Sequence, residues 1–281
     1  MGWTLDRKEL DAFGKYVRAY LKILHTNPHW KTIYFDGFAG SGARNEKVTN
    51  KLYGQLKLTE EEEHVYKGAA ERVIGLDNSF DYYYFIDRQQ SLQKLESKLR
   101  SLPESAGKEM VFKADDCNNQ LRKLAEAMRS CKYAALVLLD PFGMDIEWEA
   151  ISSLKETKSD IWILIPTGVI VNRLLDSAGQ LKFSSHLTSF FGLSEPEIRK
   201  EFYRTEKQVT LFGENEMVKK IEDPIHHIAQ LYIRQMKTIW NFVTESPLVL
   251  YNSRNVPIYH FVFASNNKVG YKIAGDIIKN I

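Results

Sequence analysis

Acidic residues follow four short apolar runs of the chain. Asp36 follows TIYF, and Asp87 follows YYYFI. Asp115 and Asp116 come just after MVFK, and Asp140 follows AALVLL. Carboxylates gathered on one edge of a fold repel one another and cost stability unless a ligand or hydrogen bonds satisfy them. If these runs are strands of one sheet, their ends form a single acidic rim, and we expect a ligand at that rim.

The loop after the first run joins an acid to closely spaced glycines. It reads Asp36, Gly37, Phe38, Ala39, Gly40, Ser41, Gly42. Glycine permits a tight turn after a strand and the close approach of a ligand. A dinucleotide-binding loop has the pattern G-x-G-x-x-G and opens directly into a helix, whereas this loop leads into a polar stretch. The pattern favours a cofactor with a cationic amino-acid end, which Asp36 could receive. A plain tight turn is the alternative.

The second acidic end offers a group for a ribose. Asp87, followed by Arg88, stands where an acid accepts hydrogen bonds from ribose hydroxyls in many nucleotide-binding sheets. The spacing of roughly fifty residues after the glycines exceeds the usual ~20, and a surface insertion explains the excess. Alternatively, Asp87 caps the helix expected to begin near Gln90.

The third acidic end offers polar groups for an adenine edge. It comprises Asp115, Asp116, Cys117 and Asn118. Capping of the following helix by Asp116 or Asn118 is the alternative. We interpret Cys117 as a small apolar filler and not as a nucleophile.

The fourth acidic end reads Asp140, Pro141, Phe142, Gly143. A residue before proline is held extended, and the adjacent aromatic ring offers a stacking face for a planar substrate. This pairing suits transfer to an amine, because the acid can orient the amine while the ring stacks on the base. A turn with a packed Phe142 is the alternative.

The apolar runs that position these residues alternate with helical patterns. Strands are expected at 32–35, 82–86, 110–113, 134–139 and 161–165, and helices at 10–24, 69–76, 90–102, 119–130 and 148–155. Continuous apolar strands separated by helices indicate a parallel sheet buried on both faces. The fold class is therefore α/β and doubly wound.

The remaining segments suggest how the chain is divided. Residues 1–181 and 246–281 are expected to form the core, with an acidic surface insertion at 45–67. Residues 182–245 show helical signals without strand alternation and are expected to form a helical insertion or lid. Ser194 is expected as a helix N-cap, and a second long helix is expected at 225–243. Runs at 248–251 and 259–264 predict an antiparallel hairpin at a sheet edge, and 270–279 a closing helix.

Composition excludes several classes of protein. The 281 residues include 44% apolar and 26% charged residues, and 38 Lys and Arg stand against 36 Asp and Glu. Two cysteines are too few for a disulfide scaffold or a cysteine-rich metal site. No run approaches the ~20 apolar residues of a membrane span, so a cytoplasmic location without a membrane partner is expected. His226 and His227 would diverge on a helix, and no metal site is expected.

The motifs together carry a family resemblance. The segments DGFAGSG, YFID, ADDCN and LLDPFG, in this order, resemble those of class I S-adenosylmethionine-dependent methyltransferases. With YFDGFAGSG, YYYFID, LVLLDPFG, IPTGVIVNRLL and HLTSFFG, the chain is similar over nearly its whole length to the three-Cys-motif partner family (TcmP). The resemblance implies a Rossmann-like fold with a seven-stranded, mostly parallel sheet, an antiparallel C-terminal hairpin strand and a helical insertion.

The resemblance also implies roles for the strand-end residues. Asp36, Gly40 and Gly42 would hold the methionine part of S-adenosylmethionine. Asp87 would bind the ribose, and Asp116 with Asn118 would lie near the adenine. Asp140, Pro141 and Phe142 would face the methyl acceptor. Phe142 stands where related amino-methyltransferases carry a second proline, so the aromatic ring comes one position early.

The sequence alone is compatible with three functions. The first is a methyltransferase acting on an exocyclic amino group of a nucleobase in nucleic acid, such as tRNA or DNA. The second is a cofactor-binding, non-catalytic subunit assembled with a three-cysteine-motif, radical-type partner protein. The third is a dinucleotide-dependent enzyme on a similar sheet. Local basic excess at 1–35 and 88–132 offers faces for a polyanion.

Overall fold

The computed structural model describes residues 5–27, 29–40, 68–130, 132–141, 143–174, 181, 183–210, 213–252 and 254–281. The expected acidic insertion at 45–67 lies outside these residues. All seven predicted strands are present within them, each within two residues of the expected ends: β1 Lys31–Asp36, β2 Tyr82–Asp87, β3 Met110–Ala114, β4 Tyr133–Leu139, β5 Ser159–Ile165, β9 Leu248–Tyr251 and β10 Pro257–Ser265.

One mixed sheet runs through the described part of the chain. Its strand order is β3-β2-β1-β4-β5-β10-β8, with β8 at Phe242–Val243 and with β9 also paired to β10. The first five strands are parallel, and β10 runs antiparallel to β5, β8 and β9. The last strand of the chain thus lies inside the sheet, next to the fifth. This order is that of the class I methyltransferase-like fold.

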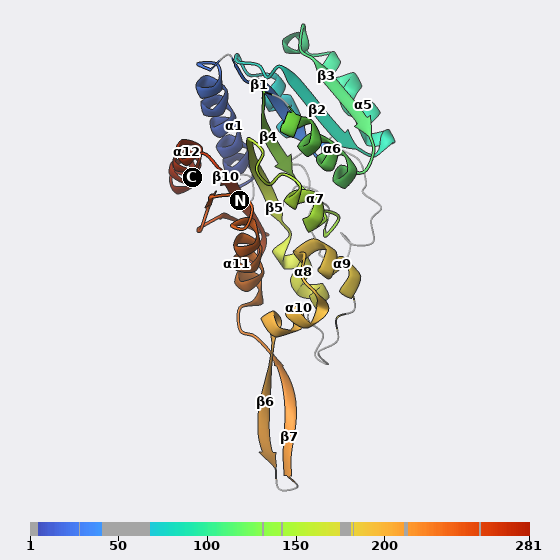
Figure 1. The fold of residues 1–281 in the computed structure, drawn as a ribbon, viewed down its shortest axis with the longest axis vertical. Coiled ribbons are helices and arrows are strands. Elements are labelled where there is room, and N and C mark those ends of the chain that lie inside the picture. The colour runs from blue at the N-terminus through green and yellow to red at the C-terminus, as the bar shows by residue number, and fades with distance from the viewer. Residues whose placement is uncertain are drawn as a thin grey trace.

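Helices cover both faces of the sheet (Figure 1). One face packs against α1 Leu5–Leu24, α4 Ala69–Ile74, α5 Gln89–Arg100 and α12 Lys268–Lys279. The other packs against α6 Cys117–Ser130, α7 Trp148–Ser152, α8 Thr167–Leu174 and α11 Pro224–Met236. Side chains of β1 alternate between the two cores, with Ile33 and Phe35 on one side and Tyr34 on the other. Burial on both faces explains why the parallel strands are continuously apolar.

The segment expected to be wholly helical contains a hairpin. Helices α9 Ser184–Phe191 and α10 Glu195–Phe202 form as expected, and Ser194 caps α10 in a capping box with Glu197. After α10, however, β6 Tyr203–Thr210 and β7 Gly213–Lys220 pair antiparallel with each other and project from the body (Figure 1). The expectation of helix alone was wrong here. The hairpin forms a two-stranded sheet separate from the main one, so the pattern of strands buried on both faces does not predict it.

Two further corrections concern the second half of the chain. Helix α8 directly follows β5 and was not predicted. The helix expected at 225–243 ends at Met236, and the two-residue strand β8 follows shortly after. The predicted antiparallel hairpin is confirmed at this end of the sheet, where β9 pairs with β10, and β10 also pairs with β5 and the short strand β8.

None of the helices in the described part of the chain has both the length and the apolar character needed to cross a membrane.

Candidate functional site

A cavity of about 900 Å³ lies at the carboxyl end of the parallel strands. The loop after β1 contributes Gly37 and Phe38, the end of β2 contributes Asp87 and Arg88, and the end of β3 with the start of α6 contributes Ala114, Asp115, Asp116, Cys117 and Asn118. These are the segments that the sequence predicted to meet at one rim. They meet because the parallel strands all end at the same edge of the sheet.

Asp87 holds the glycine loop in place. Its carboxylate accepts hydrogen bonds from the backbone N–H of Gly40 at 2.7 Å and of Arg88 at 2.6 Å. Gly40 has a φ of 65°, a left-handed conformation that favours glycine. Arg88, and not Asp87, occupies the N-cap position of α5. Burial raises the pKa of Asp87, and the two N–H donors oppose that shift. Asp87 therefore lines the cavity and also fixes the loop that borders it.

Asp36 lies beneath the glycine loop. Its side chain is buried, with 3% exposed, and it accepts hydrogen bonds from the Phe38 N–H at 3.3 Å and the Tyr34 hydroxyl at 3.2 Å. Burial, with a contribution from Asp87, raises the pKa of Asp36 to about 7. Ala39 is buried beside this loop, and its N–H donates to the Ile86 carbonyl at 3.0 Å. The Asp36 carboxylate therefore stabilises the glycine loop by accepting the hydrogen bond from the Phe38 N–H. Gly42 lies outside the described residues.

The residues of the third acidic end have three different roles. Asp116 caps α6 by accepting from the Asn119 N–H at 3.1 Å, as the alternative interpretation expected. Asp115 is exposed and accepts from Gln120 and Lys123. Cys117 is buried, and burial raises the pKa of its thiol well above the usual range. A neutral, buried thiol is a filler and not a nucleophile.

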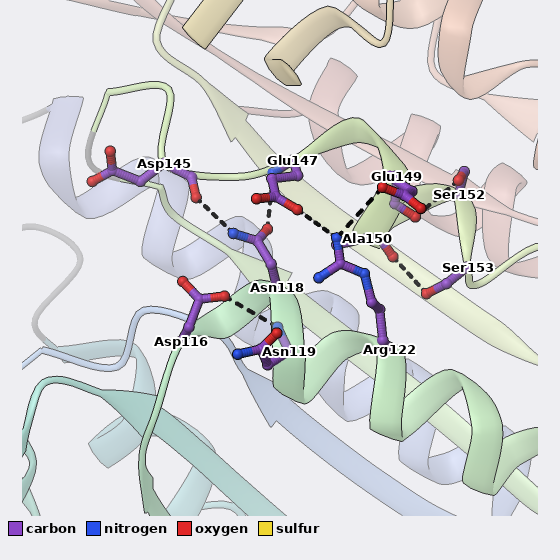
Figure 2. Close-up of polar contacts among 10 residues, drawn as sticks. All are labelled: Asp116, Asn118, Asn119, Arg122, Asp145, Glu147, Glu149, Ala150, Ser152 and Ser153. Atoms are coloured by element: carbon purple, nitrogen blue, oxygen red, sulfur yellow. Dashed lines mark hydrogen bonds and ion pairs between the residues drawn. The ribbon is translucent and has the colours of Figure 1, made fainter. Parts of the chain in front are cut away.

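Asn118 clamps the loop that follows β4 (Figure 2). Its amide donates to the Asp145 carbonyl at 3.1 Å and accepts from the Glu147 N–H at 2.8 Å. Arg122, one turn further along α6, forms ion pairs with Glu147 and Glu149 on the same segment. The Asn118 side chain is only 4% exposed. Its oxygen and nitrogen both serve the loop, so Asn118 acts as a positioning residue at this end of the cavity.

Replacing Asn118 by alanine is expected to lower the free energy of unfolding by about 1–3 kcal/mol. The change leaves the Asp145 carbonyl and the Glu147 N–H without their partner in a largely buried place. Urea unfolding followed by circular dichroism measures the loss. Asn119→Ala is the matched control, because Asn119 is exposed on the next position of the same helix. Equal effects from the two substitutions would contradict the clamp.

Asp140 directly follows β4 and lies near Asp36. It is partly exposed, and Pro141 and Gly143 after it are buried. Burial, with a further contribution from Asp36, raises the pKa of Asp140 to about 7. Gly143 has a φ of 75°, so the chain turns sharply there. Phe142 lies outside the described residues. Among the described residues that line the cavity, neither Asp36 nor Asp140 occurs.

Helix α9 forms the wall facing the strand ends. It presents Ser185, His186 and Ser189 to the cavity, while Leu187, Phe190 and Phe191 are packed into the core. The segment carries the motif HLTSFFG, whose functional residues the sequence did not assign. Alternation of polar and apolar residues at helical spacing could have indicated a two-sided helix. It could not have shown which cavity the polar side faces.

The comparisons with known proteins leave the family open. No family model matches the chain, and no curated protein matches it. Among solved structures, protein LPL1258 from Legionella pneumophila str. Philadelphia 1, of family DUF519, aligns over 92% of this chain and 97% of that one, at 13% identity and a TM-score of 0.38. That likeness is too distant to argue from, so the fold assignment rests on the strand order. Membership of the three-Cys-motif partner family is not shown.

The cavity lining is strongly acidic. Five carboxylates line it: Asp87, Asp115, Asp116, Asp145 and Glu147. Arg88 is the one Lys or Arg among the described lining residues. Glu147 is paired with Arg122 and Asp115 with Lys123, and the other three carboxylates still outnumber Arg88. Because like charges raise one another's energy, this lining favours a cationic ligand and disfavours a polyanionic one. Within the described part of the chain, no group of three or more His, Cys, Asp or Glu is arranged to hold a metal ion.

Proposed function

We propose that the chain is an S-adenosylmethionine-dependent methyltransferase whose acceptor is an exocyclic amino group of a nucleobase in nucleic acid. The acidic cavity at the strand ends is the observation that carries this proposal. S-adenosylmethionine has a net positive charge, whereas the pyrophosphate of a dinucleotide carries two negative charges. A lining of five carboxylates suits the first ligand and repels the second.

The residues present fit the parts of this cofactor. Asp87 lines the cavity at the end of β2, and each of its oxygens can accept a further hydrogen bond, from a ribose hydroxyl. Gly37 and Phe38 line the cavity beside it, next to the methionine end of the proposed site. Asp115 and Asp116 lie at the adenine end. When bound, the cofactor would supply an activated methyl group on a sulfonium, which needs no further activation by the protein.

The chain must then position the acceptor and dispose of a proton. Asp140 at the end of β4 could orient the amine by accepting a hydrogen bond from one of its N–H groups. After methylation the amine nitrogen is positively charged and loses a proton readily, so water or a carboxylate can take it. With its pKa raised to about 7, Asp140 is half ionised near neutral pH and could accept that proton. Most of the catalytic gain would come from alignment.

Isothermal titration calorimetry tests the cofactor. The wild-type protein is expected to bind S-adenosylmethionine and S-adenosylhomocysteine and not NAD. Asp87→Ala is expected to weaken binding of both by about 10- to 100-fold, because it removes charge-assisted hydrogen bonds to the ribose and releases the Gly40 N–H. Asp77→Ala, on an exposed residue away from the cavity, should bind as the wild type does.

The outcomes separate the candidate functions. No binding of S-adenosylhomocysteine by the wild-type protein would refute the proposal. Binding without methyl transfer to tRNA, DNA or protein, even with a three-cysteine-motif protein added, would instead favour a cofactor-binding subunit. Preferential binding of NAD would favour the dinucleotide enzyme.

A further inference from the structure

An exposed aromatic ring stands beside the cavity. Phe183 precedes α9 at its N-cap position, and 43% of it is exposed, which is unusual among the large apolar residues described. Its ring centroid lies 6.5 Å from that of His186, and the two ring planes are nearly perpendicular, at 80°. His186 lines the cavity directly. Phe183 is not among the described lining residues, so the contact places an exposed ring next to a ring that lines the cavity.

The helix that carries these rings is firmly held. Phe190 and Phe191 are buried and contact Tyr232 of α11. Gln235 of α11 donates to the Phe191 carbonyl at 3.0 Å. At its end, Gly192 adopts a φ of 64° against Trp148, and a Cβ there would come within 2.0 Å of the indole ring. An exposed apolar ring on a well-anchored helix is poised to bind without much loss of conformational freedom.

We propose that Phe183, with His186 packed edge-on against it, provides the stacking platform for the methyl-acceptor base, a role that rests on the proposed function. A base lifted out of a strand offers a flat aromatic face, and proteins bind such bases by stacking them on aromatic side chains. The acidic lining would repel phosphates, so only the uncharged base would enter the cavity and the backbone would stay outside.

The platform is tested with short single-stranded RNA and DNA oligonucleotides of mixed sequence that contain 2-aminopurine. Binding to protein saturated with S-adenosylhomocysteine is followed by fluorescence anisotropy, and stacking by the 2-aminopurine emission. Phe183→Ala is expected to weaken binding by about 5- to 100-fold and to change the emission of the bound base. Phe183→Trp should bind at least as well as the wild type, whereas Phe183→Leu should resemble the alanine variant, because leucine is apolar but has no π-face.

A control variant and a separate measurement of cofactor binding accompany the oligonucleotide experiment. Tyr251→Ala is the control, because Tyr251 on β9 is 38% exposed and does not line the cavity. All variants should bind S-adenosylhomocysteine as tightly as the wild type in calorimetry. Undiminished oligonucleotide binding by Phe183→Ala, full binding by Phe183→Leu, or no binding of either RNA or DNA by the wild type would overturn the platform. Loss of S-adenosylhomocysteine binding by the wild type is a separate result, which would refute the proposed function itself.

Discussion

Replacing Asp140 by alanine is expected to leave S-adenosylhomocysteine affinity nearly unchanged and to lower methyl transfer by roughly 10²- to 10⁴-fold. Asp140 does not occur among the described residues that line the cavity, so its removal takes away none of the proposed cofactor contacts. It would remove the group that orients the acceptor amine and that can take its proton. Calorimetry gives the affinity, and transfer of a radiolabelled methyl group to bulk tRNA or DNA gives the rate.

A second substitution separates the two roles of Asp140. Asparagine keeps a carbonyl oxygen that can orient the amine but cannot accept a proton. If orientation is the main role, Asp140→Asn should retain much of the activity that Asp140→Ala loses. If proton acceptance is the main role, both variants should be equally slow. Asp77→Ala is the surface control, and full transfer by Asp140→Ala would remove Asp140 from the site.

The free energy of unfolding is expected to fall as the pH rises from about 5 to 7, and Asp36 contributes to that fall together with Asp140 and Asp160, whose pKa values are raised to about 7 and about 6. The pKa of Asp36 is about 7 in the folded protein, against an ordinary value of 3.8. The folded state therefore holds a proton that the unfolded state has released over the interval between these values. Stability is greatest at the acid end of that interval and is lost as the pH rises through about 7. Full ionisation of this buried carboxylate would cost on the order of 2–4 kcal/mol.

Asp36→Asn tests this dependence. Asparagine does not titrate, so the variant should show a shallower decline in stability between pH 5 and 7, while the contributions of Asp140 and Asp160 remain. Urea unfolding of both proteins at several pH values measures the difference in slope. The absolute stability is less informative, because the amide cannot accept from both the Phe38 N–H and the Tyr34 hydroxyl. Parallel pH profiles for the two proteins would contradict the raised pKa.

The parallel part of the fold was predictable because its signal is local. Runs such as AALVLL are apolar throughout, and a strand buried on both faces must be so. The hairpin β6–β7 was not predictable by the same rule, since it forms a separate two-stranded sheet that projects from the body. The two residues of β8 are too few to show any period. The place of β10 between β5 and β8 depends on pairing partners far away in the chain.

The sequence predicted where the site lies better than it predicted the contacts that its residues make. Asp87 was assigned to the ribose, and the structure places it in the cavity while adding a second task, the hydrogen bond to Gly40. Asn118 was assigned to the adenine, whereas its amide is occupied by the loop at 145–147. No local pattern reveals such a clamp, because its partners lie almost thirty residues away and are backbone atoms.

By itself, the sequence determined that acidic residues end successive parallel strands, and parallel strands must present those ends on one edge of the sheet. Only the tertiary structure decided which of these carboxylates face the cavity and which lie behind it. Asp87 and Asp36 follow similar strands, yet one lines the cavity and the other is 3% exposed beneath the glycine loop. The structure also decided that α9 closes the opposite wall, because packing of Phe190 and Phe191 against Tyr232 turns the polar side of the helix toward the strand ends.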